Sequence, residues 1–264
     1  MLTFRDLLST FRKLDLGQAP VIAHASLKAF GDVQGGAETV VGALVAAFSA
    51  VIMPTFTYKT MITPETGPAN NGITYGSGQD SNRMAEFYRP DMPADELMGI
   101  VPETLRKHPK AQRSNHPIYS FSGVNAETAL QAQSLDDPFG PIRVLTDSSG
   151  WVLLLGVDQT VNTSIHYAEQ LAGRRQFIRW ALTPKGVIEC PRWPGCSQGF
   201  NQISPRIEAF TRKLGGGQAQ IQAIPLQDLV TTVKDMIAED PLALLCFDIG
   251  CERCNAVRVS HAEA

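Results

Sequence analysis

The sequence has no excess of positive charge and no long apolar run near its start. Its 264 residues carry 23 Lys and Arg against 26 Asp and Glu, whereas binding to nucleic acid phosphates requires a clustered excess of cations. The short basic runs, Arg106-Lys107-His108 and Gly173-Arg174-Arg175, are typical of solvated helix ends. The first twenty residues alternate charged and apolar groups, unlike a signal peptide or membrane span. We therefore expect a cytoplasmic protein that binds neither nucleic acid nor membrane.

Several common motifs are missing as well. The chain contains no G-x-G-x-x-G or Walker pattern, no internal repeat and no low-complexity tract. Ser26 lacks the G-x-S-x-G context of a hydrolase nucleophile. The five cysteines, an odd number, fit a reducing compartment better than a disulfide framework.

Strand and helix patterns alternate along the chain. Apolar spacing predicts helices at 3–13, 37–47, 100–105, 126–133, 163–171, 204–214 and 226–238. Strands are predicted at 20–24, 50–55, 120–124, 150–157 and 242–247, with a hairpin inside 177–189. This order predicts an α/β fold, a single domain over residues 1–264, with a mixed parallel and antiparallel sheet layered with helices.

Periodicity disappears between about residues 57 and 98, where glycines and prolines are frequent. A loop this long inside a compact domain is usually functional or disordered. Because the segment also contains Tyr58, Tyr75, Phe87 and Tyr88, we interpret it as an ordered insertion that walls a cleft. Its six carboxylates belong to Glu65, Asp80, Glu86, Asp91, Asp95 and Glu96. A net negative loop suits a cationic ligand, although solvated loop charge is the default interpretation.

His166 is the strongest catalytic candidate. It follows closely on the predicted strand at 150–157, and functional sites of α/β proteins lie beyond the carboxyl ends of strands. Glu169 lies three residues further on, on the same helix face. The pair could be a base with its orienting carboxylate, two metal ligands, or an ordinary helical salt bridge.

Two other histidines occupy similar addresses, His24 at the end of the first strand and His116 before the strand at 120. A structural role is the first expectation for both. Residues 24–28 could alternatively form a strand-end loop that, with Lys28 and the helix start at Gly35-Gly36, faces a phosphate.

The cysteines raise the question of a metal. Cys251 and Cys254 form a C-x2-C pair, and Cys190 and Cys196 could supply two further thiolates for a structural zinc. The spacing of the second pair is not that of a standard zinc finger, so buried or incidental thiols are the alternative.

Separated blocks of the chain resemble the aminoglycoside 3-N-acetyltransferases, also called antibiotic N-acetyltransferases. The blocks are His24-Ala25-Ser26-Leu27 with Gly35-Gly36-Ala37, Met53-Pro54-Thr55-Phe56, Met98-Gly99 leading to Glu103-Thr104, Arg113-Ser114-Asn115-His116-Pro117, Leu135-Asp136-Asp137-Pro138-Phe139-Gly140-Pro141, and Leu154-Leu155-Gly156-Val157 into Thr163-Ser164-Ile165-His166-Tyr167-Ala168-Glu169. They span most of the chain in order. Two features depart from many antibiotic-modifying members: Ile142-Arg143-Val144-Leu145 after Gly140-Pro141, and the long insertion.

The resemblance implies direct transfer of an acetyl group from acetyl-coenzyme A to a small-molecule amine, an aminoglycoside antibiotic among the candidates. His166 would be the general base and Glu103 its orienting partner, with Glu169 binding the acceptor or supporting the site. A loop with His24, Ser26, Leu27, Lys28, Gly35 and Gly36 would line the coenzyme A site. Thr163 and Ser164 are candidate donors to the oxyanion. The insertion would form the acceptor pocket.

The sequence also allows two rival hypotheses. One is a zinc-dependent hydrolase built on His166, Glu169 and His24. The other is a non-catalytic small-molecule binder that retains the coenzyme A cleft. The sequence leaves open whether the chain forms an oligomer.

Overall fold

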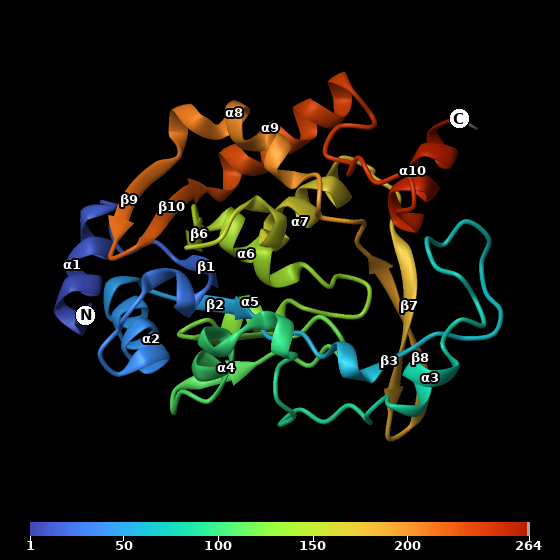
Figure 1. Ribbon diagram of the computed structural model, residues 1–264, viewed down its shortest axis with the longest axis horizontal. Helices are drawn as coiled ribbons and strands as arrows, with labels where there is room; N and C mark the ends of the chain where they lie inside the picture. The colour runs from blue at the N-terminus through green and yellow to red at the C-terminus, as the bar shows by residue number, and fades with distance from the viewer. Residues whose placement is uncertain (263–264) are drawn as a thin grey trace.

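A seven-stranded sheet runs through the centre of the molecule, in the order β4-β5-β2-β1-β6-β10-β9. It is seen in a computed structural model that describes residues 1–262 (Figure 1). The strands are β1 (Val21–Ala25), β2 (Val51–Pro54), β4 (Ala111–Arg113), β5 (Phe121–Val124), β6 (Trp151–Leu155), β9 (Arg212–Gly216) and β10 (Ala219–Pro225). Strands β2, β1 and β6 are parallel, and the other neighbours are antiparallel. The predicted mixed sheet is confirmed.

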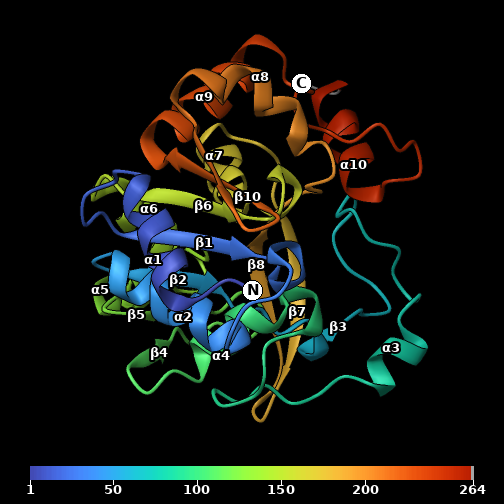
Figure 2. The same ribbon diagram turned by 60° about the vertical axis from the view of Figure 1, so that its left-hand side comes forward.

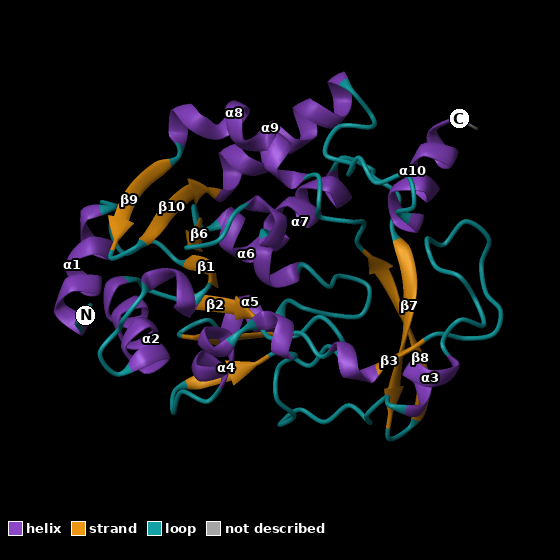
Figure 3. Ribbon diagram, in the orientation of Figure 1, coloured by secondary structure: helices purple, strands orange, loops and turns teal. Residues whose placement is uncertain are grey.

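Helices cover both faces of this sheet (Figure 3). One face carries α1 (Phe4–Lys13), α2 (Gly36–Ala47) and α4 (Ile100–Arg106), and the other carries α5 (Glu127–Gln131), α6 (Gly140–Asp147), α7 (Thr163–Leu171) and α9 (Leu226–Glu239). Strand side chains alternate between the two layers. In β1, Val21 and Ala23 join the core under α2, while Ile22 joins the core under α7.

A second, three-stranded sheet lies to one side, made of β3 (Met61–Ile62), β7 (Phe177–Thr183) and β8 (Gly186–Trp193). The predicted hairpin is confirmed, with β7 and β8 joined at Pro184-Lys185. The last helix, α10 (Glu252–Ala262), lies beside the loop around residue 70 (Figure 1, Figure 2). There Asn70 Nδ2 donates to the carbonyl of Ala256 at 3.2 Å.

The insertion contains little regular structure. It holds the 3-10 turns at Tyr58–Thr60 and Glu96–Met98, strand β3 and the short helix α3 (Gln79–Arg83). It is nevertheless anchored: the Asn71 side chain donates to the carbonyl of Ile178 at 3.1 Å and accepts from its amide at 2.8 Å.

Two predicted elements are wrong. The helix expected at 204–214 stops early, because α8 (Ser204–Ile207) and a 3-10 turn (Glu208–Phe210) give way to β9, which pairs with β10. The strand expected at 242–247 is a series of turns, since Leu244 has a φ of 65° that breaks an extended conformation. Ala243, Leu244, Leu245 and Cys246 are nevertheless buried, which explains the centre of the apolar pattern, whereas Leu242 and Phe247 at its ends are exposed. Strands β4 and β10 and helices α6 and α10 were not predicted.

Among residues 1–262, no helix combines the length and apolar composition needed to cross a membrane.

Candidate active site

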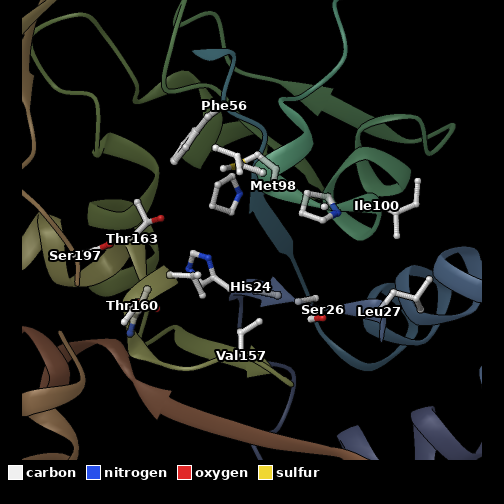
Figure 4. Close-up of a pocket in the computed structure, with 18 of the residues that line it drawn as sticks. His24, Ser26, Leu27, Phe56, Met98, Ile100, Val157, Thr160, Thr163 and Ser197 are labelled. Carbon is white, nitrogen blue, oxygen red and sulfur yellow. The ribbon is translucent and has the colours of Figure 1, made fainter. Parts of the chain in front are cut away.

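A cavity of about 660 Å³ opens at the carboxyl ends of the parallel strands. Its wall includes His24 from β1, Pro54 from β2 and Val157 just after β6. Figure 4 shows side chains from distant parts of the chain, among them Phe56, Met98, Thr163 and Ser197, surrounding one space. This is the place where α/β folds bind ligands, because loops diverge from the ends of adjacent parallel strands there.

Helix α7 brings His166 to this cavity. The Asn162 side chain caps the helix by accepting from the Ser164 amide at 3.1 Å, and Thr163 and His166 both line the cavity. The cap fixes where the helix begins, so it also fixes which side chains of the first turns face the cavity. The predicted position of His166, shortly after the end of a strand, is confirmed.

The imidazole of His166 is paired with a buried carboxylate. Its Nδ1 lies 2.9 Å from Oε2 of Glu169, one helical turn away, and the Glu169 side chain is 3% exposed. The other carboxylate oxygen faces Nε of Arg174 at 3.7 Å, a charge pair rather than a hydrogen bond. The Arg174 guanidinium donates to the carbonyl of Ala243 at 2.7 Å. His166, Glu169 and Arg174 thus form a buried chain of charge-assisted contacts.

This arrangement assigns the imidazole tautomer. An ionised carboxylate can only accept, so Nδ1 of His166 carries the proton that points at Glu169. The other ring nitrogen, Nε2, then holds a lone pair on a ring that lines the cavity. The geometry is that of a general base with an orienting carboxylate.

Aromatic side chains hold the ring in place. The Phe200 ring meets it edge-on at 4.7 Å between centroids, and the Phe139 ring is stacked at 6.5 Å. These contacts, together with the Glu169 hydrogen bond, restrict rotation of the imidazole. No local pattern of the sequence marked Phe200. The solvated helix end predicted at Arg174 is wrong, because its side chain is 2% exposed.

Glu103 is not placed as the resemblance implied. Its carboxylate accepts hydrogen bonds from the Arg106 side chain at 2.7 and 2.8 Å and from the Ala94 amide at 3.0 Å, and it pairs with Lys107. Burial opposes ionisation, but these hydrogen bonds lower the pKa of Glu103 to about 2. The carboxylate at hydrogen-bond distance from His166 is that of Glu169, the neighbour in sequence. Glu103 anchors α4 to the insertion.

Only some of the residues expected to bind coenzyme A lie at the cavity. His24, Ser26, Leu27 and Lys28 line the cavity, whereas Gly35 and Gly36 begin α2 outside its wall. A 3-10 turn at Leu27–Phe30 follows β1 and carries the chain away from the cavity before α2 starts. The strand-end loop, but not the glycine pair, therefore faces the cavity.

The two other strand-associated histidines are buried and neutral. Burial lowers the pKa of His24 to about 3 and that of His116 to about 4. His116 Nδ1 accepts from the amides of Ile118 at 3.1 Å and Tyr119 at 2.9 Å, which is the structural role expected of it. His24 Nε2 is buried at the cavity and has no hydrogen-bond partner within residues 1–262.

The insertion contributes Tyr58, Leu97 and Met98 to the cavity wall, but none of its six carboxylates. These acidic residues instead serve locally. Asp95, for example, accepts from the Leu97 amide at 3.0 Å and caps a 3-10 turn. The default interpretation, solvated loop charge, therefore fits these residues better than attraction of a cationic ligand to the wall that residues 1–262 form.

The predicted group of four cysteines is wrong in one member, because Cys246 takes the place of Cys190. The thiols that come together are those of Cys196, Cys246, Cys251 and Cys254. Cys190 is buried in the β7–β8 hairpin instead, where burial raises the pKa of its thiol to about 12. In the described part of the chain these four cysteines are the only such group of potential ligands. His24, His166 and Glu169 therefore do not form the ligand set that the zinc-hydrolase hypothesis requires.

Fold and site together define an α/β enzyme with a carboxylate-supported histidine beside a cavity. Residues 22–238 match the family model of aminoglycoside 3-N-acetyltransferases. Aminoglycoside N(3)-acetyltransferase III from Salmonella sp. is 29% identical over 262 residues, covering 88% of this chain and 90% of that protein. The chain belongs to the aminoglycoside 3-N-acetyltransferase family and is an acyltransferase.

Solved structures agree with the fold. The apoenzyme of aminoglycoside acetyltransferase AAC(3)-IVa superimposes with a TM-score of 0.79 at 23% identity, covering 98% of both chains. AAC-IIIb in a binary complex with CoASH superimposes with a TM-score of 0.70 at 20% identity, covering 90% of this chain and 96% of that one.

Proposed function

We propose that this protein transfers the acetyl group of acetyl-coenzyme A directly to an amino group of an aminoglycoside, with His166 as general base. The observation that carries the proposal is the 2.9 Å contact between His166 Nδ1 and Glu169 Oε2 beside the cavity at the strand ends. Family membership supports the acetyl donor and the class of acceptor, because a related structure holds CoASH and the curated relatives are named for aminoglycosides.

The reaction follows from the chemistry of these groups. An acceptor ammonium must lose a proton before its nitrogen can attack the thioester carbonyl, and Nε2 of His166 takes that proton. The nitrogen–carbon bond forms, and the ammonium nitrogen of the tetrahedral intermediate loses its second proton to solvent. The intermediate then collapses, and the carbon–sulfur bond breaks to release the neutral amide and coenzyme A as a thiolate. The protonated imidazole can return its proton to this thiolate. Glu169 stabilises the imidazolium while it exists.

Three polar groups are candidate donors to the oxyanion. Thr163 and His24 line the cavity. Ser164 Oγ and His24 Nε2 are buried and have no hydrogen-bond partner among residues 1–262. A buried donor that lacks a partner costs free energy in the resting enzyme, and that cost is recovered if the donor meets the developing oxyanion. Because burial lowers the pKa of His24 to about 3, its ring is neutral and can donate from only one nitrogen.

The cosubstrate would occupy the part of the cavity lined by Ser26, Leu27 and Lys28. The Lys28 ammonium is a compact cation suited to phosphate groups. Apolar side chains of the wall, such as Leu27 and Ile100, would contact the pantetheine arm. The insertion residues Tyr58, Leu97 and Met98 then face the acceptor side, and residues 1–264 act as a single domain whose insertion forms part of the acceptor pocket.

The test is a thiol-release assay with acetyl-coenzyme A and a panel of amines. The panel contains an aminoglycoside with a free 3-amino group, the same compound already acetylated at that position, and a simple monoamine. We expect turnover with the first compound and little with the second, and fragmentation of the product to locate the new acetyl group. If coenzyme A raises the melting temperature but no amine releases thiol, the protein is a non-catalytic binder and the proposal is wrong.

A further inference from the structure

Four cysteine thiols converge next to the site without taking part in the chemistry above. Their sulfur atoms, from Cys196, Cys246, Cys251 and Cys254, all lie within 4.8 Å of one another, and those of Cys246 and Cys254 are 3.4 Å apart. All four are free thiols, three of them buried and Cys251 half-buried.

These distances match a metal cage rather than disulfides. Four thiolates bound tetrahedrally at a Zn–S distance of ~2.3 Å have their sulfur atoms ~3.8 Å apart. A disulfide brings two sulfurs to ~2.05 Å and leaves no geometric reason for a second pair to converge on the same point. Here one group contains all four sulfurs with no two more than 4.8 Å apart, which leaves room for a tetrahedral set around one ion.

The surroundings also fit a bound metal. Metal-bound thiolates usually accept hydrogen bonds from backbone amides, and the Gln198 amide donates to Cys196 Sγ at 3.4 Å. Arg253, which lies between two of the cysteines in sequence, donates to the carbonyl of Gly195 at 2.9 Å. Its guanidinium would partly balance the net negative charge of four thiolates around a divalent ion.

Two of these thiols, those of Cys246 and Cys251, belong to a segment without regular structure. Residues 241–251 contain neither helix nor strand, and Phe247 and Ile249 are 87% and 90% exposed. Residues 243–246 are buried, but residues 247–250, between the two cysteines, are exposed. An exposed stretch of this kind has low local stability unless another interaction ties it down. A metal bound by residues from two distant parts of the sequence would supply that interaction.

We propose that Cys196, Cys246, Cys251 and Cys254 bind one zinc ion as a closed, structural site. The site joins the end of the β7–β8 hairpin to the start of α10. The metal would also help to position the cavity wall, because Ser197 and Gln198, directly after Cys196, line the cavity. Its effect reaches the insertion as well, because Asn70 hydrogen bonds to Ala256 and Ser260 of α10. With four protein ligands the zinc has no open position for substrate.

Metal analysis of a protein that contains residues 1–264 tests the proposal, using protein purified without a histidine tag from zinc-supplemented cells. We expect one zinc ion per chain in the wild type and in a Cys190→Ser variant, because Cys190 lies outside the group. Cys251→Ser should lose most of the zinc. It is the variant least prone to misfold, since Cys251 is the half-buried member of the set.

A second measurement does not depend on any variant. Wild-type protein exchanged with cobalt(II) should show the sulfur-to-cobalt charge-transfer band and the intense visible bands of a tetrahedral tetrathiolate site, and zinc should abolish them. Wild-type protein that contains no zinc, that contains iron instead, or that gives only the spectrum of octahedral cobalt would overturn the proposal. Full retention of zinc by Cys251→Ser would overturn the ligand assignment.

Discussion

Nδ1 of His166 lies 2.9 Å from Oε2 of Glu169 on the same helix, and both side chains are more than nine-tenths buried. An imidazole held in this way carries its proton on the nitrogen that faces the carboxylate and a lone pair on the other nitrogen. The sequence neighbour of the histidine, rather than the distant Glu103, therefore provides the carboxylate that orients it.

Replacing the base tests this relationship most directly. We expect His166→Ala to lower kcat by roughly 100-fold or more, because the acceptor ammonium would lose its positioned proton acceptor. Steady-state thiol release at saturating cosubstrate measures the effect. His261→Ala is the matched control, since His261 is exposed near the end of α10. Unchanged turnover of the His166 variant would remove His166 from the mechanism.

A pair of glutamate variants distinguishes the two carboxylates. Glu169→Gln keeps the side-chain shape but removes the charge that stabilises the imidazolium, so kcat should fall at least about tenfold. Glu103→Gln should leave kcat close to the wild-type value, because the Glu103 carboxylate is bound to Arg106 and Lys107. Both rates are compared per folded molecule, as Glu169→Gln also leaves Arg174 without its charge partner and lowers stability. The reverse order of effects would restore Glu103 as the partner of His166.

Lys28 allows a test of the cosubstrate site. Lys28→Met retains most of the side-chain length and removes the ammonium, so we expect KM for acetyl-coenzyme A to rise several-fold, with a smaller change in kcat. The expected rise becomes smaller at high salt, because ions screen the interaction between ammonium and phosphate. Lys13→Met, on the last turn of α1, serves as the control. Equal KM values for the two variants would place the phosphates elsewhere.

Two buried histidines predict how stability depends on pH. Burial lowers the pKa of His24 to about 3 and of His116 to about 4, whereas both titrate near 6.5 in the unfolded chain. Below pH 6.5 the unfolded chain therefore binds protons that the folded protein does not. The stability that depends on these neutral histidines is therefore complete above pH 6.5. As the pH falls below that value, the free energy of unfolding should decrease by up to about 1.4 kcal/mol per pH unit for each histidine.

Urea unfolding at pH 7 and pH 5 measures this slope. His116→Asn offers an oxygen that can accept from the amides of Ile118 and Tyr119 but does not titrate. The variant should therefore show a smaller loss of stability on acidification than the wild type. An identical loss in both proteins would contradict the assignment of His116 as a buried, neutral group.

The local patterns of the chain predicted much of the fold, because each depends on residues close in sequence. The helix at Phe4–Lys13 with its Thr3 cap, the strands at Val21–Ala25 and Trp151–Leu155, and the β7–β8 hairpin all have short-range signals of this kind. The apolar run at 242–247, by contrast, was predicted as a strand and forms turns. Buried turns are as rich in apolar residues as buried strands, so the apolar run alone does not separate a turn from a strand. In the structure, the positive φ of Leu244 shows that this segment is not extended.

By itself, the sequence determined the mixed α/β architecture, the address of His166 beyond a strand end and the blocks that resemble a family. Its helical spacing also placed Glu169 on the same face as His166. Tertiary structure decided what the carboxylates bind, since the ion pair of Glu103 depends on how α4 folds onto the insertion. It likewise buried Arg174 against Ala243, 69 residues away, and placed Cys246 rather than Cys190 beside Cys196. Such partnerships depend on distances in space between segments far apart in the chain, which no local pattern of residues records.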